Sequence, residues 1–174
     1  MYIIRREQPQ DVPKIRDVNK RAFGQDQEAL IVDRLRENCN SILSLVALAG
    51  NEVVGHILFS PAVIEGENGK LVGSGLAPLA VLPEYQRKGI GSELVQTGIA
   101  RIRNGGCPYI IVLGYPEYYA RFGFEPASKY GTRSEWDVPD EGAFMILLLN
   151  RRIMKNVSGV AKYREEWSEA IIRA

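Results

Sequence analysis

The sequence places two glycines and two cations together in the segment Val81–Ser92, which follows an apolar run and precedes a helical pattern. The first N–H groups of a helix have no intrahelical partner, and together with the positive end of the helix dipole they favour an anion. Gly89 and Gly91 lack the Cβ atoms that would keep an anion away, and Arg87 and Lys88 add positive charge. The segment therefore predicts a pyrophosphate-binding loop, with an ordinary glycine-rich turn and solvated cations as the alternative.

Two familiar phosphate-binding motifs are absent from the chain. No Gly-x-x-x-x-Gly-Lys-Ser/Thr segment occurs, and Leu94 stands where the dinucleotide-binding fingerprint has its third glycine. P-loop NTPases and Rossmann enzymes are therefore excluded. The stretch Gln86–Gly91 instead resembles motif A of the GNAT acyltransferases, Gln/Arg-x-x-Gly-x-Gly/Ala, which follows a strand and holds the pyrophosphate of acetyl-coenzyme A.

A second segment carries the same resemblance. Leu113–Pro126 contains Tyr119 followed by Gly123 and Phe124, and it is similar to the Tyr-x-x-x-Gly-Phe segment of the GNAT family. Further segments narrow the resemblance to the YhbS-like branch, so that the matches span nearly the whole chain. These segments are Gly55–Ser60, Val138–Glu141 with Ala143–Met145, and Gly159–Tyr163.

The resemblance implies a fold and an activity. The fold is α+β, with a mixed central sheet of about six or seven strands flanked by about four helices. A single GNAT domain is expected over residues 1–174, with residues 151–174 as a C-terminal extension packed on it. The implied activity is N-acetyl transfer from acetyl-CoA directly to the amine of a small molecule or protein, in a ternary complex without an acyl-enzyme. No metal is expected to take part, and the protein is expected to be a monomer or a homodimer.

The resemblance also assigns roles to individual residues. Val81 is expected to present its main-chain N–H to the thioester oxygen. Tyr119 is the candidate proton donor to the departing thiolate, because a phenol with its ordinary pKa of about 10 is protonated at neutral pH. The alternatives are that Tyr119 is an aromatic core residue, or that the neighbouring Tyr118 supplies the hydroxyl. The expected cofactor contacts are Leu79, Ala80, Val81, Gln86, Arg87, Lys88, Gly89, Ile90, Gly91, Ser92, Tyr118 and Phe122.

No general base is evident in the sequence. Many members of the family carry a Glu on the strand before motif A, whereas residues 73–78 here read Gly-Ser-Gly-Leu-Ala-Pro. Deprotonation through water and deprotonation by His56, the only histidine, are the open candidates, although a lone histidine on a strand is more often packed and hydrogen-bonded. Glu84 and Glu117 are expected to be solvated. The segment Ser128–Glu141 lies where acceptors approach in related enzymes, and its mixed charge is typical of a polar acceptor site or of a packed surface loop.

Hydrophobic periodicity predicts the elements that position these residues. Helices are expected over Pro9–Ala22, Ala29–Leu35, Ile90–Ile102 and Pro116–Phe122, and a short one in the tail Val160–Ala174. Strands are expected at Tyr2–Arg6, Leu43–Ala49, Val53–Ile64, Lys70–Val81, Tyr109–Leu113 and Ala143–Leu149. The second and third of these strands are expected to form a hairpin, and Pro78 is expected to interrupt the fourth.

Composition limits the partners and the location. The 174 residues include 22 Lys and Arg and 21 Asp and Glu, so the net charge of +1 provides no general attraction to nucleic acids or anionic membranes. This argues against one alternative function, acetylation of aminoacyl-tRNA, while a non-catalytic acyl-CoA sensor stays a second alternative. Cys39 and Cys107 form no disulfide or zinc framework by their spacing. The first residues lack an apolar signal sequence, so a cytoplasmic location is expected.

Overall fold

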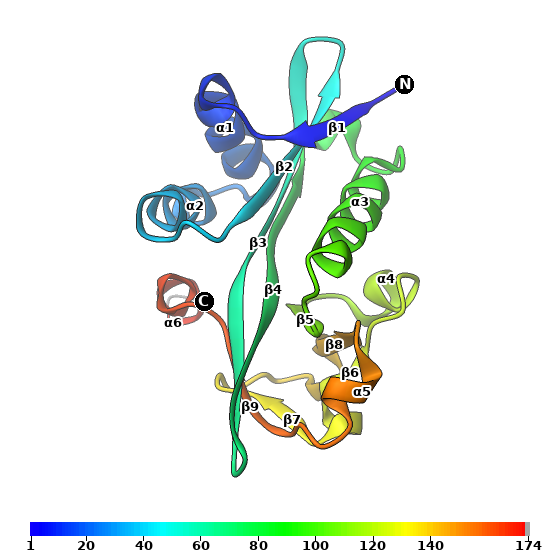
Figure 1. Ribbon diagram of the computed structural model, residues 1–174. Helices are drawn as coiled ribbons and strands as arrows, with labels where there is room; N and C mark the ends of the chain where they lie inside the picture. Colours follow the sequence, from blue (N-terminus) through cyan, green and yellow to red (C-terminus); the bar gives the residue numbers. More distant parts are fainter. Residues whose placement is uncertain (173–174) are drawn as a thin grey trace. The chain divides into compact units, whose positions relative to one another are not determined.

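The computed structural model describes residues 1–172, and the chain divides into two compact units (Figure 1). The first unit comprises Met1–Ser60, Ala77–Ala100 and Ile172, and the second comprises Pro61–Leu76 and Arg101–Ile171. The long strands β3 (Glu52–Gly66) and β4 (Gly69–Val81) contribute residues to both units. The organisation of the whole chain as a single domain stays a prediction.

In the first unit, helices cover both faces of antiparallel strands. β1 pairs with β2, and β2 pairs with β3 in the expected hairpin. Figure 1 shows α1 and α2 on one side of these strands and α3 on the other. Val53–Ser60 of β3 is buried throughout, because side chains on both faces of the strand meet a helix. The further elements are β1 (Ile3–Arg6), a 3₁₀ turn (Pro9–Asp11), α1 (Val12–Phe23), α2 (Gln27–Asn38), β2 (Leu43–Ala49) and α3 (Ile90–Asn104).

The second unit contains a mixed set of strands. β4 pairs with β5 in parallel, and β8 lies antiparallel between β5 and β6. β9 pairs in parallel with β7 and antiparallel with the far end of β3. The elements are β5 (Tyr109–Leu113), α4 (Pro116–Ala120), β6 (Glu125–Pro126), β7 (Thr132–Ser134), β8 (Phe144–Leu148), α5 (Arg151–Met154), β9 (Gly159–Lys162) and α6 (Ser168–Ile172).

The α+β class and the mixed sheet are confirmed, but short elements were missed. Residues 1–172 contain nine strands and six α-helices, more than predicted, and the additions are β6, β7, β9 and α5. The short helix predicted in the tail Val160–Ala174 is α6, and it takes up only part of this segment. Val160 and Ala161 pair instead with Glu65 and Ile64, a long-range contact that local periodicity does not reveal, and α6 begins only at Ser168. Residues 173–174 lie outside the described part.

Two boundaries also differ from the prediction. β4 continues through Pro78, because its pairing with β5 covers only Ser74–Leu76, so the proline that lacks an N–H lies beyond this ladder. α4 ends at Ala120, two residues earlier than predicted. Gly123, at a φ of +93°, gives the chain the left-handed turn that leads out of this helix.

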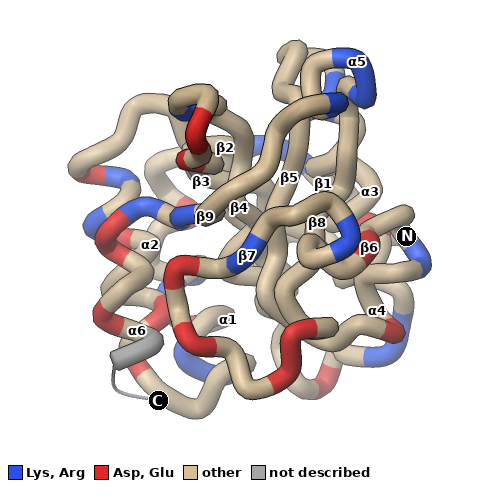
Figure 2. The backbone as a smooth tube through the Cα atoms, turned by 90° about the horizontal axis from the view of Figure 1, so that it is seen from below, with Lys and Arg blue, Asp and Glu red and all other residues tan. Residues whose placement is uncertain are grey.

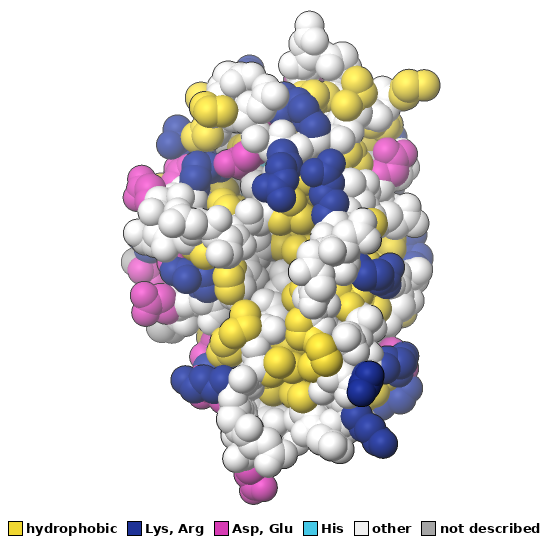
Figure 3. All heavy atoms as spheres, viewed as in Figure 1, with side chains coloured by type: hydrophobic (Ala, Val, Ile, Leu, Met, Phe, Trp, Pro, Cys, Tyr) yellow, Lys and Arg dark blue, Asp and Glu magenta, His cyan; other side chains and the backbone are white. Residues whose placement is uncertain are grey.

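Charged residues of both signs are distributed along the chain (Figure 2). The molecular face in Figure 3 likewise carries Lys, Arg, Asp and Glu side chains among hydrophobic and neutral ones. This arrangement agrees with the net charge of +1. Within residues 1–172, no helix has the length and apolar character needed to cross a membrane.

Helix α3 approaches β3 closely at two glycines. A Cβ atom at Gly55 would lie 3.1 Å from Ile90 Cγ2, and one at Gly98 would lie 2.5 Å from Phe59 Cζ. Gly55 and Phe59 are four residues apart on the strand and therefore share the face that α3 covers, whereas His56 points to the opposite face. This packing holds the first turn of α3 against β3, and with it the loop that leads into the helix.

We expect Gly98→Ala to destabilise the protein by about 1–3 kcal/mol, because the added methyl group overlaps the buried ring of Phe59. The higher helix propensity of alanine offsets only part of this cost. Chemical denaturation of both proteins measures the difference. Gly105→Ala is the matched control, since its Cβ would meet only carbonyl oxygens at 3.4 Å or more, and equal losses in the two variants would contradict the packing argument.

Candidate active site

The loop between β4 and α3 is tied to the neighbouring strands at two points. The N–H of Leu82 donates to the carbonyl of Val54 at 2.9 Å, and Nε2 of Gln86 donates to the carbonyl of Val81 at 3.0 Å. Pro83–Tyr85 forms a single 3₁₀ turn between these contacts. Gln86 therefore closes the loop through its own side chain and holds its two ends together.

Two left-handed residues direct the chain into α3. The φ angles are +59° at Arg87 and +88° at Gly89, and a non-glycine residue in this region is uncommon. The N–H of Glu93 donates to the carbonyl of Gly89 at 3.0 Å as the first bond of the helix. The amides of residues 90–92 precede this bond, so they have no intrahelical acceptor and favour an anion at this end of the helix.

The loop has both room and charge for a diphosphate. No heavy atom lies within 4 Å of the position that a Cβ of Gly89 would take. Arg87 and Lys88 are exposed, and neither forms an ion pair within the described part of the chain. Glu84, also exposed as expected, pairs with Arg21 at 2.8 Å. The residues present therefore fit a pyrophosphate, as the sequence predicts.

The structure divides the predicted site residues between the two units. Leu79, Ala80 and Val81 end β4 and run directly into the loop, so these strand residues and residues 86–92 lie together in the first unit. Tyr119 lies in the second unit, with Tyr118 and Phe122 next to it.

Tyr119 sits on α4 with 8% of its surface exposed. Its ring makes edge-to-face contacts with Tyr118 and Phe124, at centroid distances of 5.0 and 5.7 Å. A Cβ at Gly114 would overlap this ring, so the glycine after β5 makes room for it. Burial, and secondarily the neighbouring Tyr118, raises the pKa of the Tyr119 phenol. The phenol therefore holds its proton at neutral pH and is a weaker acid than an exposed tyrosine.

Tyr118 and Phe122 form an aromatic cluster with Arg121. The rings of Tyr118 and Phe122 meet edge to face at 5.4 Å, and the Arg121 guanidinium carbon lies 4.5 Å from the Tyr118 centroid. Both aromatic residues are half-buried. Their contact with a cofactor stays a prediction.

His56 is buried completely and bonded on both ring nitrogens. Nδ1 lies 3.1 Å from Nδ2 of Asn19, and Nε2 lies 2.9 Å from Oγ of Ser44. An amide nitrogen only donates, so Nδ1 accepts and Nε2 carries the hydrogen given to Ser44. Ser44 in turn donates to Glu7, which pairs with Arg36 at 2.7 Å. The imidazole therefore has the packed, hydrogen-bonded role and no exposed nitrogen with which to serve as a general base.

This environment predicts a loss of stability in mild acid. Burial lowers the pKa of His56 to about 4, from an ordinary value of 6.5. The unfolded chain thus takes up the proton first, and His56 favours the folded state above pH 6.5, with this advantage lost as the pH falls toward 4. We expect a loss of about 3 kcal/mol across this interval.

Urea denaturation of the wild type and of His56→Gln between pH 7 and pH 4 tests this expectation. Glu7 contributes a loss of the same sign, because hydrogen bonds from Arg36 and Ser44 outweigh burial and lower its pKa. The variant keeps Glu7, so the difference between the two slopes isolates the imidazole. Parallel pH profiles for the two proteins would contradict the effect.

Tyr163, which follows β9, is a site residue that sequence reasoning did not assign. Its hydroxyl donates to the carbonyls of Leu76 and Ile111, at 2.9 and 3.2 Å. These groups flank Leu76 and Val112, the last residue pair of the β4–β5 ladder, so the phenol lies at the end of that ladder. Burial, and secondarily Tyr119, raises the pKa of the Tyr163 phenol. The only sequence signal for Tyr163 was that it ends Gly159–Tyr163, one of the segments that resemble the YhbS-like branch.

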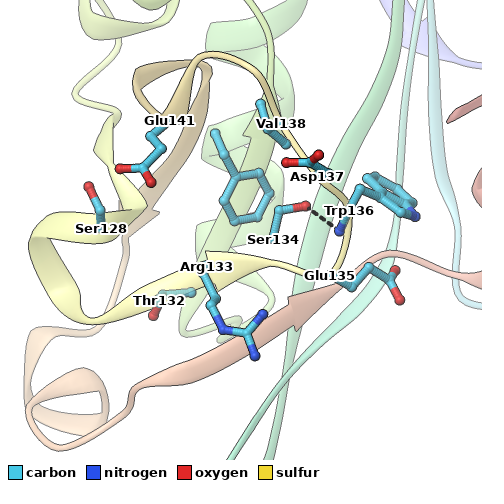
Figure 4. Close-up of a pocket in the computed structure, with 10 residues that line it drawn as sticks. Ser128, Thr132, Arg133, Ser134, Glu135, Trp136, Asp137, Val138 and Glu141 are labelled. Atoms are coloured by element: carbon cyan, nitrogen blue, oxygen red, sulfur yellow. Dashed lines mark hydrogen bonds between the residues drawn. The ribbon is translucent and has the colours of Figure 1, made fainter.

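A pocket of about 440 Å³ opens in the second unit, around the segment after β7 (Figure 4). Trp136 lines it and stacks on Tyr163, with ring centroids 5.4 Å apart and an interplanar angle of 15°. The segment Ser128–Glu141, for which the sequence left a packed surface loop and an acceptor site open, thus forms a wall of this cavity. The lining residues are Ser128, Thr132, Arg133, Ser134, Glu135, Trp136, Asp137, Val138, Glu141 and Phe144.

Neither thiols nor metal ligands are gathered into a centre. Cys39 is buried and Cys107 half-buried, and both are free. Among the residues that the structure describes, no group of three His, Cys, Asp or Glu side chains is placed to hold a metal ion.

The fold and the loop between β4 and α3 are those expected of an acyltransferase, and comparison with known proteins agrees. Residues 3–127 match the family described as acetyltransferase (GNAT) domain. The chain therefore belongs to the GNAT acetyltransferase family, whose fold it has.

Relatives cover most of the chain. Escherichia coli YjhQ, described as an uncharacterized N-acetyltransferase, is 44% identical over 134 residues, which are 75% of this chain and 74% of the relative. E. coli YhbS, described in the same words, is 36% identical over 167 residues, or 95% and 98% of the two chains.

Two similar structures contain the cofactor. The crystal structure of E. coli YhbS with CoA has a TM-score of 0.89 at 35% identity, over 96% of this chain and 92% of that one. A GNAT acetyltransferase from Brucella melitensis with acetyl-CoA has a TM-score of 0.78 at 33% identity, over 96% and 98%.

Proposed function

We propose that this protein is an N-acetyltransferase that uses acetyl-CoA and transfers the acetyl group directly to an amine in a ternary complex. The observation that carries the proposal is the loop between β4 and α3, where left-handed Arg87 and Gly89 leave the amides of residues 90–92 free beside open space. The relatives solved with CoA and with acetyl-CoA support the same ligand. We propose that one GNAT domain, residues 1–174, performs this reaction.

Main-chain groups bind the cofactor in this proposal. The amides of residues 87–92 hold the diphosphate, helped by the side chains of Arg87 and Lys88. Leu79, Ala80 and Val81 present their backbone to the rest of the cofactor, and the N–H of Val81 hydrogen-bonds the thioester oxygen as charge develops there. Because these contacts are main-chain contacts, the side chains of this strand affect them only through its position.

Proton transfer is assigned to Tyr119 and to water. Tyr119 gives its phenolic proton to the thiolate of the departing coenzyme, and its raised pKa guarantees that the proton is present. The acceptor amine loses its proton through water, since both ring nitrogens of His56 are engaged and buried. Cys39 and Cys107 take no part, because direct transfer needs no acyl-enzyme.

Calorimetry and a thiol-release assay test this function. We expect acetyl-CoA to bind with one site per chain, and free thiol to appear faster with a suitable amine than by hydrolysis alone. Binding without amine-dependent release across a broad amine panel would identify a sensor. Absence of binding by the folded protein would refute the proposal altogether.

A further inference from the structure

The pocket around β7 carries an excess of negative charge. Glu135, Asp137 and Glu141 line it and are exposed, and none forms an ion pair within residues 1–172. In Figure 4, Asp137 and Glu141 lie on opposite sides of the pocket, while Arg133 points away from both. Three carboxylates against one arginine leave the lining with a net negative charge.

The neighbouring Asp140 differs from Asp137 and Glu141, because its carboxylate is bonded within the loop. Oδ1 of Asp140 accepts from the N–H of Gly142 at 2.9 Å and so caps the 3₁₀ turn Glu141–Ala143. Asp137 and Glu141 have no such side-chain bond among the described residues. Their charges face solvent and the pocket, where a cation would find them unpaired.

A second observation points to a ligand here. Thr132 lines the same pocket, only 2% of its surface is exposed, and its Oγ1 has no hydrogen-bond partner within the described residues. Buried hydroxyls are almost always bonded, so an orphan one beside a cavity indicates a group that completes it. A ligand that brings a donor or acceptor, directly or through water, would satisfy this hydroxyl.

The pocket and the proposed proton donor lie in the same unit. Trp136 forms part of the pocket lining, and its ring stacks on that of Tyr163. Tyr163 is further fixed by hydrogen bonds to the carbonyls at the end of the β4–β5 ladder. The aromatic pair thus joins the acidic cavity to the end of β5, and the ring of Tyr119 lies against Gly114, just beyond that end.

We propose that this pocket holds the acceptor, and that the acceptor is a small molecule with a second positive charge besides the amine that is acetylated. The inference rests on the proposed function. The reacting amine must be neutral to attack, so carboxylates that select for charge act on another cation of the same molecule. Apolar lining from Trp136, Val138 and Phe144 suits a methylene chain between the two nitrogens, and the volume is in the range of small-molecule sites.

A charge series of equal chain length tests the proposal. Thiol release is measured with 1,4-diaminobutane, 1-aminobutane and 4-aminobutanoate, at low and at high salt. We expect kcat/KM to fall in that order, with the diamine ahead of the monoamine by about fivefold at low salt and by less at high salt, because exposed charges are screened. Equal values for the three amines would overturn the inference and leave the proposed function standing.

The double variant Asp137→Asn, Glu141→Gln identifies the residues responsible. We expect it to bring the diamine to within about twofold of the monoamine, because the diamine loses much more activity than the monoamine does. Glu67→Gln, an exposed carboxylate at the turn between β3 and β4, is the matched control and should preserve the preference. An equal loss for all three amines in the double variant would indicate a structural role and overturn the inference.

Direct binding separates this inference from the proposed function. Calorimetry with 1,4-diaminobutane, with and without CoA, should show heat in the wild type that the double variant loses. Heat of the same size in both proteins, or none in the wild type under either condition, would overturn the pocket assignment. Failure of acetyl-CoA itself to bind refutes the proposed function, and the diamine titration still decides the pocket.

Discussion

Gly89→Val is expected to weaken acetyl-CoA binding at least about tenfold, and to raise the KM for acetyl-CoA accordingly. A left-handed conformation costs a residue with a Cβ roughly 1–2 kcal/mol, so valine drives the loop toward another path. In the original path, its side chain would fill the open space beside the amides of residues 90–92. Both effects act on the one place where the diphosphate is proposed to bind. Isothermal titration calorimetry measures the change.

Gly24→Val is the matched control for backbone strain. Gly24 ends α1 in the same unit with a φ of +71°, and nothing lies within 4 Å of its Cβ position. We expect both variants to lose similar stability and only Gly89→Val to lose affinity. Val81→Ile leaves the main chain unchanged, so we expect its affinity for acetyl-CoA to be nearly that of the wild type. Unaltered acetyl-CoA affinity in folded Gly89→Val would show that the cofactor binds elsewhere.

Tyr119→Phe is expected to lower kcat by roughly 100-fold, while the affinity for acetyl-CoA stays nearly the same. General acid catalysis by a placed side chain contributes at least this much, and only the hydroxyl is removed. The ring is kept, so the edge contacts with Tyr118 and Phe124 persist and folding should be little affected. Steady-state kinetics with a saturating amine separates kcat from KM.

Tyr118→Phe distinguishes the two neighbouring hydroxyls. If Tyr119 is the donor, this variant keeps most of its turnover, and the opposite result transfers the role to Tyr118. The pH profile adds a second readout, because burial raises the pKa of Tyr119. We therefore expect no alkaline loss of kcat from this phenol at or below its ordinary pKa of about 10. Full activity in Tyr119→Phe would remove the role.

Local features of the sequence were enough to predict that the loop between β4 and α3 binds an anion. The small residues, the cations and the helical pattern that predict it all lie within a few positions of one another. Glycine also permits the left-handed φ that Gly89 adopts before the helix. The hairpin of β2 and β3 and the buried strand β5 follow in the same way from short-range patterns. Whether each of these segments forms a strand, a turn or a loop could therefore be predicted without knowing its long-range contacts.

Features set by long-range contacts could not be predicted. β9 exists because residues around Val160 pair with the end of β3, almost a hundred positions earlier, and Pro78 is tolerated because the parallel ladder stops at Leu76. The alternatives for His56 were open in sequence, and its burial between Asn19 and Ser44 decided between them.

The sequence by itself therefore determined the family, and it predicted the cofactor loop and the candidate proton donor, since each depends on residues that are close together along the chain. The tertiary structure alone placed Trp136 on Tyr163, and Tyr163 beside the end of β4 and β5. It also gathered unpaired Asp137 and Glu141 around one cavity with the buried hydroxyl of Thr132. Specificity for an acceptor depends on such combinations, because burial and the absence of a partner are properties of the folded chain and not of any segment.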